Sequence, residues 1–281
     1  MPSFVLSIAD ITLQLIDDAP VLPVWLTQHC QPFSPTSAPK DIAVVVHIHR
    51  DASLCVGQDD LIYSIDDTPG VFRIRGVDFE AERSGCEAPI HVRAHPEAGM
   101  AGVLRWLMGI LLLERDGLFL HAMSFAREGS GVLGPGPSGR GKTTLSRLIR
   151  PHVDLFTDET TALRFIGEAP VIYATPFAGE LGPVSGPASA MLDAVLLLRH
   201  ASETKAGPMR HAQVVAELLG CAFLPLRHGP WMSRALTLME RLARAVPCRS
   251  FGFRPEPEVW EAIEDVCFRS RYAHMAAGPS A

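Results

Sequence analysis

The sequence lacks an apolar run long enough to cross a bilayer, and its start lacks the features of a secretion signal. The longest apolar stretch, Val103 to Leu113, contains the charged Arg105 and falls short of the roughly 20 residues that a spanning helix needs. The opening Met1-Pro2-Ser3-Phe4 has neither a basic region nor a following apolar core. We therefore expect a cytoplasmic protein with no membrane partner, in which Val103 to Leu113 belongs to a buried helix.

The sequence also lacks paired cysteines and clustered basic residues. Its six cysteines form neither a Cys-x-x-Cys pair nor a zinc-type spacing with histidine, so reduced thiols of a cytosolic protein are the simplest interpretation. The basic residues are dispersed and the net charge is −6, so the chain has no positive footprint for a nucleic acid. These features disfavour a zinc protein and a nucleic-acid ATPase.

Hydrophobic residues make up 47% of the 281 residues, which is enough for a sizeable interior. The overall pattern predicts an α/β fold in three parts. Residues 1–98 carry short β-type runs separated by Pro, Gly, Ser and Asp, which predict a small, mostly antiparallel β module. Residues 99–270 are predicted to form the main α/β domain, and the small residues 271–281 a flexible tail.

The expected strands of the first module are Phe4–Ile8, Ile11–Leu15, Ile42–His49, Leu61–Ile65, Val71–Ile74 and Ile90–Val92. Apolar spacing in the main domain predicts helices over 101–115, 144–150, 209–219, 230–245 and 257–267. The strands expected there are 118–125, 130–133, 153–156, 162–165, 171–173, 191–199 and 250–253.

A complete Gly-x-x-x-x-Gly-Lys-Thr phosphate-binding loop lies between an expected strand and an expected helix. The predicted nucleotide-binding residues are Gly136, Pro137, Ser138, Gly139, Arg140, Gly141, Lys142, Thr143 and Thr144. In such a loop the glycines let backbone N–H groups turn toward phosphates, the lysine reaches the β- and γ-oxygens, and the threonine hydroxyl is left for Mg²⁺. A glycine-rich turn without a ligand is the alternative, and the Gly-Lys-Thr ending disfavours it.

Asp158 and Glu159 follow the next expected strand and are the leading acidic candidates. Phosphoryl transfer to a hydroxyl needs a phosphate cradle, a carboxylate for the metal and a base near the acceptor proton. If their strand neighbours the loop strand, both carboxylates would lie near the γ-phosphate. The alternative is an ordinary helix cap or turn, which the sequence Thr-Asp-Glu-Thr also suits; the loop sixteen residues earlier favours the functional interpretation.

Other residues leave more than one interpretation open. His121 ends a run just before the loop strand, where it would either assist the base or be a satisfied core histidine, and its spacing favours neither. The segment Ala174 to Glu180 fits an ordinary Pro/Gly connection better than a site loop. A basic residue that stabilises transferred charge could be among Arg199, Lys205, Arg210, Arg227 and Arg234, and the sequence does not select one of them.

Taken together, these residues resemble the kinase domain of the HPr kinase/phosphorylase family. The resemblance covers approximately residues 100–265. It rests on four segments and on the interval between His121 and Lys142; the segments are Leu120-His121-Ala122, Gly134 to Thr144, Phe156-Thr157-Asp158-Glu159 and Ala174-Thr175-Pro176-Phe177. It implies an ATP-dependent serine kinase whose P-loop core is related to phosphoenolpyruvate carboxykinase.

The resemblance also implies a role for each matching residue. Lys142 would bind the phosphates and Thr143 would hold Mg²⁺, while Asp158 would be the base for the serine hydroxyl, assisted by His121. Glu159 stands where the family has a second aspartate and would serve the metal. Glu180 is the further acidic residue assigned to the metal, with a looser match.

Two departures from the family bear on the substrate. The arginine-rich signature associated with phosphorolysis is missing, and the first 95 residues do not resemble the classical regulatory domain. This layout is similar to HPr-kinase-like proteins of peptide natural-product pathways, including lasso peptide maturation, which implies a precursor peptide with an acceptor serine. The alternatives are HPr itself, a small alcohol, or a module that senses ATP without catalysis. The family forms hexamers, so a homo-oligomer is a further expectation.

Overall fold

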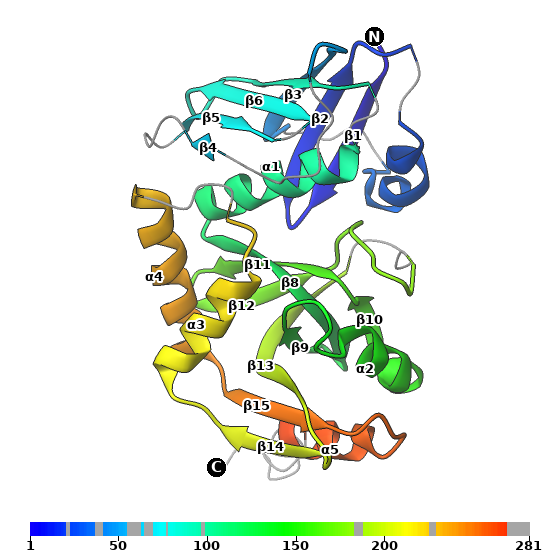
Figure 1. Cartoon of the computed structure of the whole chain (residues 1–281), viewed down its shortest axis with the longest axis vertical. Helices are drawn as coiled ribbons and strands as arrows, with labels where there is room; N and C mark the ends of the chain where they lie inside the picture. The colour runs from blue at the N-terminus through cyan, green and yellow to red at the C-terminus, as the bar shows by residue number, and fades with distance from the viewer. Residues whose placement is uncertain are drawn as a thin grey trace, which may run out of the picture.

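In the computed structural model, a mixed α/β fold is built on two mixed β-sheets (Figure 1). The structure describes residues 1–20, 23–36, 42–54, 63–64, 70–76, 78–96, 99–182, 188–224 and 229–268. The expected tail at 271–281 and much of the expected strand at 61–65 lie outside these ranges. No helix in the described ranges has both the length and the apolar character needed to cross a membrane.

The N-terminal sheet contains the strands expected from the sequence and one more. Its strands are β1 (Ser3–Ile8), β2 (Ile11–Asp17), β3 (Val44–Arg50), β4 (Tyr63–Ser64), β5 (Val71–Arg75), β6 (Phe79–Ser84) and β7 (Ile90–Ala94). They pair in the order β1-β2-β3-β7-β6-β5-β4. The described pairings are mostly antiparallel, as expected, but β3 runs parallel to both β2 and β7.

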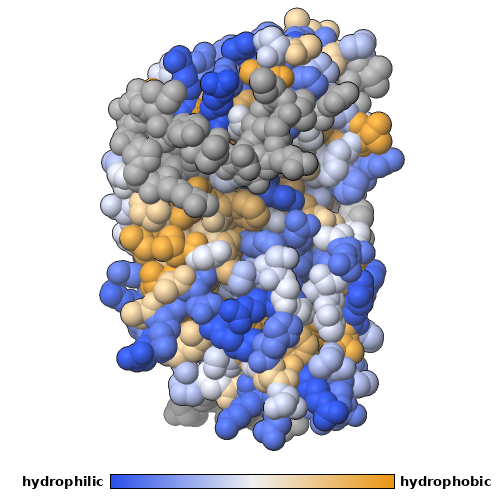
Figure 2. All heavy atoms as spheres, in the orientation of Figure 1, coloured by the Kyte–Doolittle hydropathy of each residue, from blue (hydrophilic) through white to orange (hydrophobic). Residues whose placement is uncertain are grey.

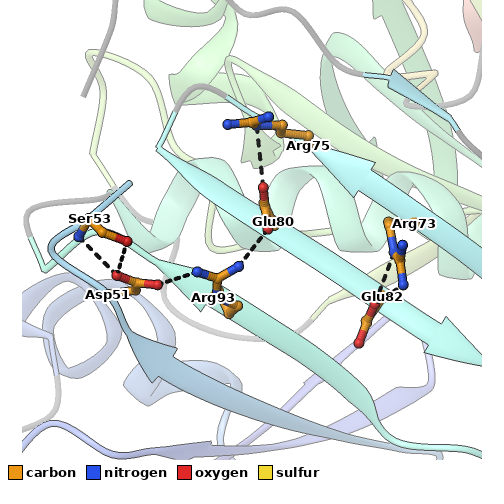
Figure 3. Close-up of polar contacts among 7 residues, drawn as sticks. All are labelled: Asp51, Ser53, Arg73, Arg75, Glu80, Glu82 and Arg93. Carbon is orange, nitrogen blue, oxygen red and sulfur yellow. Dashed lines mark hydrogen bonds and ion pairs between the residues drawn. The ribbon is translucent and has the colours of Figure 1, made fainter. Parts of the chain in front are cut away.

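One face of the N-terminal sheet is apolar and the other is charged. Alternation along the strands buries residues such as Ile74 and Val92, while their neighbours face solvent. On the solvent face, register places opposite charges across adjacent strands: Arg75 lies against Glu80, and Glu80 against Arg93 (Figure 3). Such cross-strand ion pairs match strand register but add little stability where they are exposed.

Five strands of the C-terminal sheet pair with one another in a closed circuit. Its strands are β8 (Gly117–Arg127), β9 (Ser130–Pro135), β10 (Asp154–Thr157), β11 (Thr160–Ile166), β12 (Ala169–Tyr173), β13 (Ser189–His200), β14 (Lys205–Pro208) and β15 (Cys248–Phe253). β8 pairs with β11, β11 with β12, β12 with β13, β13 with β9, and β9 with β8 again. Beyond this circuit, β10 extends the edge of β8, and β15 and β14 extend from β13.

Helices cover both faces of the central strands. They are α1 (Met100–Glu114), α2 (Lys142–Ile149), α3 (His211–Cys221), α4 (Gly229–Ala245) and α5 (Val259–Cys267). Val132 of β9 belongs to a core with α2 and α5, whereas the adjacent Leu133 belongs to the core with α1, α3 and α4. Burial on both faces explains why β9 is buried throughout instead of alternating.

The helix α1 lies between the two sheets (Figure 1) and joins them into one core. Arg83 of β6 is buried and forms an ion pair with Glu114 of α1 at 2.9 Å, and its other N–H groups bond to the carbonyls of Gly85 and Cys86. Most of the surface in view is hydrophilic, and the broadest hydrophobic area lies at the level of α4 (Figure 2). The domain boundary expected between residues 98 and 99 stays a prediction. One apolar core includes residues of both sheets and of α1, so the core does not divide the chain at that point.

Candidate active site

The β8–β9 hairpin places His121 beside the start of the phosphate loop. Its register pairs Ala122 with Pro135, and the N–H of Gly136 donates to the carbonyl of His121 at 3.3 Å. The loop then turns through Gly139 and Gly141, whose φ angles are +81° and +89°. Position 141 requires glycine for two reasons. Its φ angle is positive, and a Cβ there would lie 2.9 Å from the Phe253 ring.

The helix α2 begins at Lys142, so the predicted order of strand, loop and helix is present. Gly141 at the N-cap has no side chain to cap the helix, which leaves the N–H groups of the first turn available to an anion. The Lys142 side chain is buried and donates to the carbonyls of Gly136 at 2.7 Å and Pro137 at 3.1 Å. Burial lowers the pKa of this ammonium group, and the nearby carboxylates of Glu159 and Asp158 oppose that shift.

Asp158 lies between β10 and β11. These two strands pair one after the other with the same edge of β8, and β9 pairs with the opposite edge. The Asp158 side chain is only 2% exposed. The hydroxyl of Thr143 donates to Oδ2 at 3.3 Å, and the N–H of Gly179 donates to Oδ1 at 2.9 Å. The carboxylate is therefore held between the phosphate loop and the segment after β12.

The segment from Ala174 to Glu180 belongs to this site, although the sequence favoured an ordinary connection. The Thr157 hydroxyl donates to the carbonyl of Phe177 at 3.2 Å, and that of Thr175 donates to the carbonyl of Thr160 at 2.6 Å. Gly179 approaches Asp158 so closely that a Cβ would lie 2.7 Å from Oδ2. Two threonines and one glycine thus fix the segment against the acidic junction.

Glu159 faces an arginine that the sequence did not select. Its Oε1 lies 3.2 Å from a guanidinium nitrogen of Arg105 on α1. The Arg105 guanidinium also lies over the rings of Phe177 and Phe223, at 5.4 and 5.5 Å from their centroids. Its Nε is buried and finds no acceptor among the described residues.

The sequence named five basic residues as candidates to stabilise transferred charge. None of those that the structure describes lines the cavity at the phosphate loop. Arg199 pairs with Glu217 at 2.6 Å, and Arg234 contacts Asp116 at 3.1 Å. Arg227 lies outside the described residues. The only sequence signal for Arg105 was its own charge within the apolar run of α1.

His121 has a neutral imidazole at neutral pH. It pairs across the sheet with Thr160, and its ring is parallel to that of Phe223 with centroids 6.3 Å apart. Burial, with smaller contributions from the charges of Lys142 and Arg105, lowers the pKa of His121 from 6.5 to about 4. A neutral ring in this position can exchange hydrogen bonds with a phosphate or a carboxylic acid without adding charge.

A cavity of about 410 Å³, called the phosphate pocket below, lies at the phosphate loop. Its volume is within the usual range for small-molecule sites. Its lining includes His121, Asp158, Glu159 and Gly179, and from the loop Ser138, Gly139, Gly141, Lys142, Thr143 and Thr144. His200 lies at the rim, with Nε2 2.5 Å from the carbonyl of Gly139. The fold therefore brings together residues that are up to 79 positions apart in the sequence, from His121 to His200.

The predicted metal ligands are arranged unequally. Thr143 contacts Asp158, the predicted base, whereas the other two predicted ligands are paired with arginines: Glu159 with Arg105, and the exposed Glu180 with Arg147 at 2.7 Å. Across the described ranges, no three His, Cys, Asp or Glu side chains are close enough together to hold a metal alone. Thr143 and Glu159 nevertheless line the same cavity, and one hydroxyl with one carboxylate suits Mg²⁺, which in nucleotide sites takes its other ligands from phosphates and water.

Comparison with models of protein families and with curated proteins gives no match for this chain. The function must be inferred from the geometry and from the motif pattern.

Proposed function

We propose that this chain is an ATP-dependent serine kinase with a P-loop core of the HPr-kinase type. The observation that carries the proposal is the contact between Thr143 of the phosphate loop and Asp158, at 3.3 Å, in the cavity that Lys142 and His121 also line. A glycine-rich turn without a ligand would not need a buried carboxylate at this point. The favoured acceptor is a serine of a precursor peptide, as in lasso-type tailoring.

In this proposal the loop N–H groups and Lys142 hold the ATP phosphates. Lys142 must then exchange its two carbonyl contacts for phosphate oxygens, a change that the negative charge of the ligand favours. Thr143 and Glu159 would hold Mg²⁺, which would neutralise charge on the phosphates. Arg105 adds a cation 3.2 Å from Glu159.

The transfer step needs one proton acceptor. The serine oxygen forms a bond to the γ-phosphorus as the bond from that phosphorus to the β,γ-bridging oxygen breaks, and ADP leaves. The serine proton passes to the carboxylate of Asp158, whose oxygens are oriented by Thr143 and Gly179. Neutral His121 borders the same cavity and orients the reacting groups by hydrogen bonding.

The Asp158→Asn variant tests the assignment of the base. We expect kcat for phosphate transfer to fall by about 10²- to 10⁴-fold, because the amide cannot take the proton, while ATP affinity changes little. Purified protein is incubated with Mg-ATP and serine peptides, HPr or small alcohols, and intact mass reports transfer. Asp51→Asn, on the charged face of the N-terminal sheet (Figure 3), is the control. Full transfer by Asp158→Asn would show that Asp158 is not the base.

The Lys142→Ala variant tests phosphate binding separately. Removing the ammonium group should weaken ATP binding and also lower the transfer rate, because the lysine contacts the oxygens on which charge develops. Calorimetry with a non-hydrolysable ATP analogue measures the first effect, and steady-state kinetics the second. Undiminished turnover would contradict the kinase proposal, and tight ATP binding by the wild type without transfer to any acceptor would favour a sensing module.

A further inference from the structure

A second cavity adjoins the proposed catalytic carboxylate from the other side. Its volume is about 680 Å³, and one wall is the continuous segment from Val153 to Asp158. The facing wall comes from Leu181, Gly182 and the start of β13 at Ser189. Among the described residues, Asp158 is the only one that lines both this cavity and the phosphate pocket.

The wall formed by β10 is an unpaired sheet edge. β10 stands at the end of the strand order and pairs only with β8 among the described strands. Backbone N–H and C=O groups on the other edge of such a strand are available to an added strand. Four residues of β10 span about 13 Å, which matches a peptide segment of similar length.

The facing wall leaves room for side chains of a bound segment. Ala174, Gly182, Ala188 and Ala190 contribute small side chains or none, whereas the polar groups Thr157 and Asp158 lie at the inner end of the β10 wall. A cavity with a strand edge on one wall, mostly small residues on the facing wall and one reactive group at the end of β10 suits an extended chain that delivers a hydroxyl.

We propose that this cavity binds an extended segment of the acceptor polypeptide as an added strand on β10, which brings its serine hydroxyl to Asp158. The proposal rests on the kinase function proposed above and specifies where and in what conformation the acceptor binds. The serine oxygen then bonds to the γ-phosphorus at the phosphate pocket as ADP leaves, and the serine proton passes to the carboxylate of Asp158.

The test uses an equimolar library of unstructured peptides, each with one serine between randomised residues that carry no hydroxyl. Mass spectrometry identifies the peptide that the wild-type chain phosphorylates best with Mg-ATP. Each backbone amide of that peptide is then N-methylated in turn. We expect kcat/KM to fall by about five- to tenfold at alternate positions on one side of the serine, because only alternate amides bond to a neighbouring strand.

A variant of the cavity wall gives a second readout. Ser189→Trp should raise KM for the peptide by about tenfold or more and leave ATP affinity within about twofold, because the indole fills the cavity and not the phosphate pocket. The control is Met191→Trp, an exposed position on the same strand that lines a different surface depression. Thermal unfolding verifies that both variants fold, and the N-methyl scan needs no variant.

The outcomes separate the two proposals. Equal effects of N-methylation at every position, or none, would overturn strand addition while the kinase function stands. Transfer to HPr or to a small alcohol but to no library peptide would have the same meaning. Failure of the wild type to transfer phosphate to any hydroxyl would overturn both proposals, and it is observed before any variant is compared.

Discussion

Replacing Gly179 by alanine perturbs the proposed base without touching the phosphate loop. The new Cβ would lie 2.7 Å from Oδ2 of Asp158 and 2.9 Å from its Cγ and Oδ1. The carboxylate must therefore move by roughly 0.7 Å or more to reach ordinary van der Waals contact. Such a shift would lengthen its bonds from Thr143 and from the Gly179 N–H, since both groups approach it from fixed backbone elements.

We expect Gly179→Ala to lower kcat by about 10²-fold, because a displacement near 1 Å costs about that much in a reaction that depends on alignment. ATP affinity should stay within about threefold, and overpacking should cost about 1–3 kcal/mol of stability. Steady-state transfer, calorimetry and chemical denaturation measure the three quantities. Gly220→Ala in α3, where a Cβ meets nothing within 4 Å, is the matched control. A wild-type kcat in folded Gly179→Ala would refute a role for this alignment.

Two further predictions concern Arg105, which is paired with Glu159, and His121, which lines the same cavity as Asp158. Arg105→Lys keeps the charge but loses the planar contact with two aromatic rings, so we expect kcat about tenfold lower with nearly unchanged ATP affinity in steady-state and calorimetric assays; wild-type kinetics would contradict this. NMR titration should give His121 a pKa of about 4. Because the unfolded chain binds a proton near pH 6.5, stability should fall as pH drops from about 6.5 to 4, and His121→Phe should lessen that dependence. A midpoint near 6.5 would disprove the shift.

The parts of the site set by local sequence were predictable. The phosphate loop needs only its glycines, its lysine and flanking strand and helix patterns, and α2 begins at Lys142 as that motif requires. The position of His121 follows from a tight hairpin, in which residues before and after the turn must pair. Asp158 follows a short strand in the same sheet. Each inference used residues close together in the chain.

The parts set by tertiary packing were not predictable. Arg105 reaches Glu159 because α1 packs against β8 and β11, which no local pattern specifies. β6 was missed because its third inward residue is Arg83, whose charge hides the apolar alternation of Phe79 and Ala81. The charge is tolerated there because Glu114 and two carbonyls satisfy it. β14 was missed because Gly207 and Pro208 disfavour a strand except at a sheet edge.

The junction between β10 and β11 explains why two different carboxylates face different partners. Backbone N–H groups would be left unpaired where the chain leaves the edge of β8, and the Thr157 hydroxyl accepts those of Glu159 at 3.1 Å and Thr160 at 3.3 Å. This turn directs Asp158 toward Thr143 and Glu159 toward Arg105. Because the same junction ends the unpaired edge of β10, a segment added to that edge would run directly to Asp158. The binding of the acceptor and the position of the base would then both depend on the turn between β10 and β11.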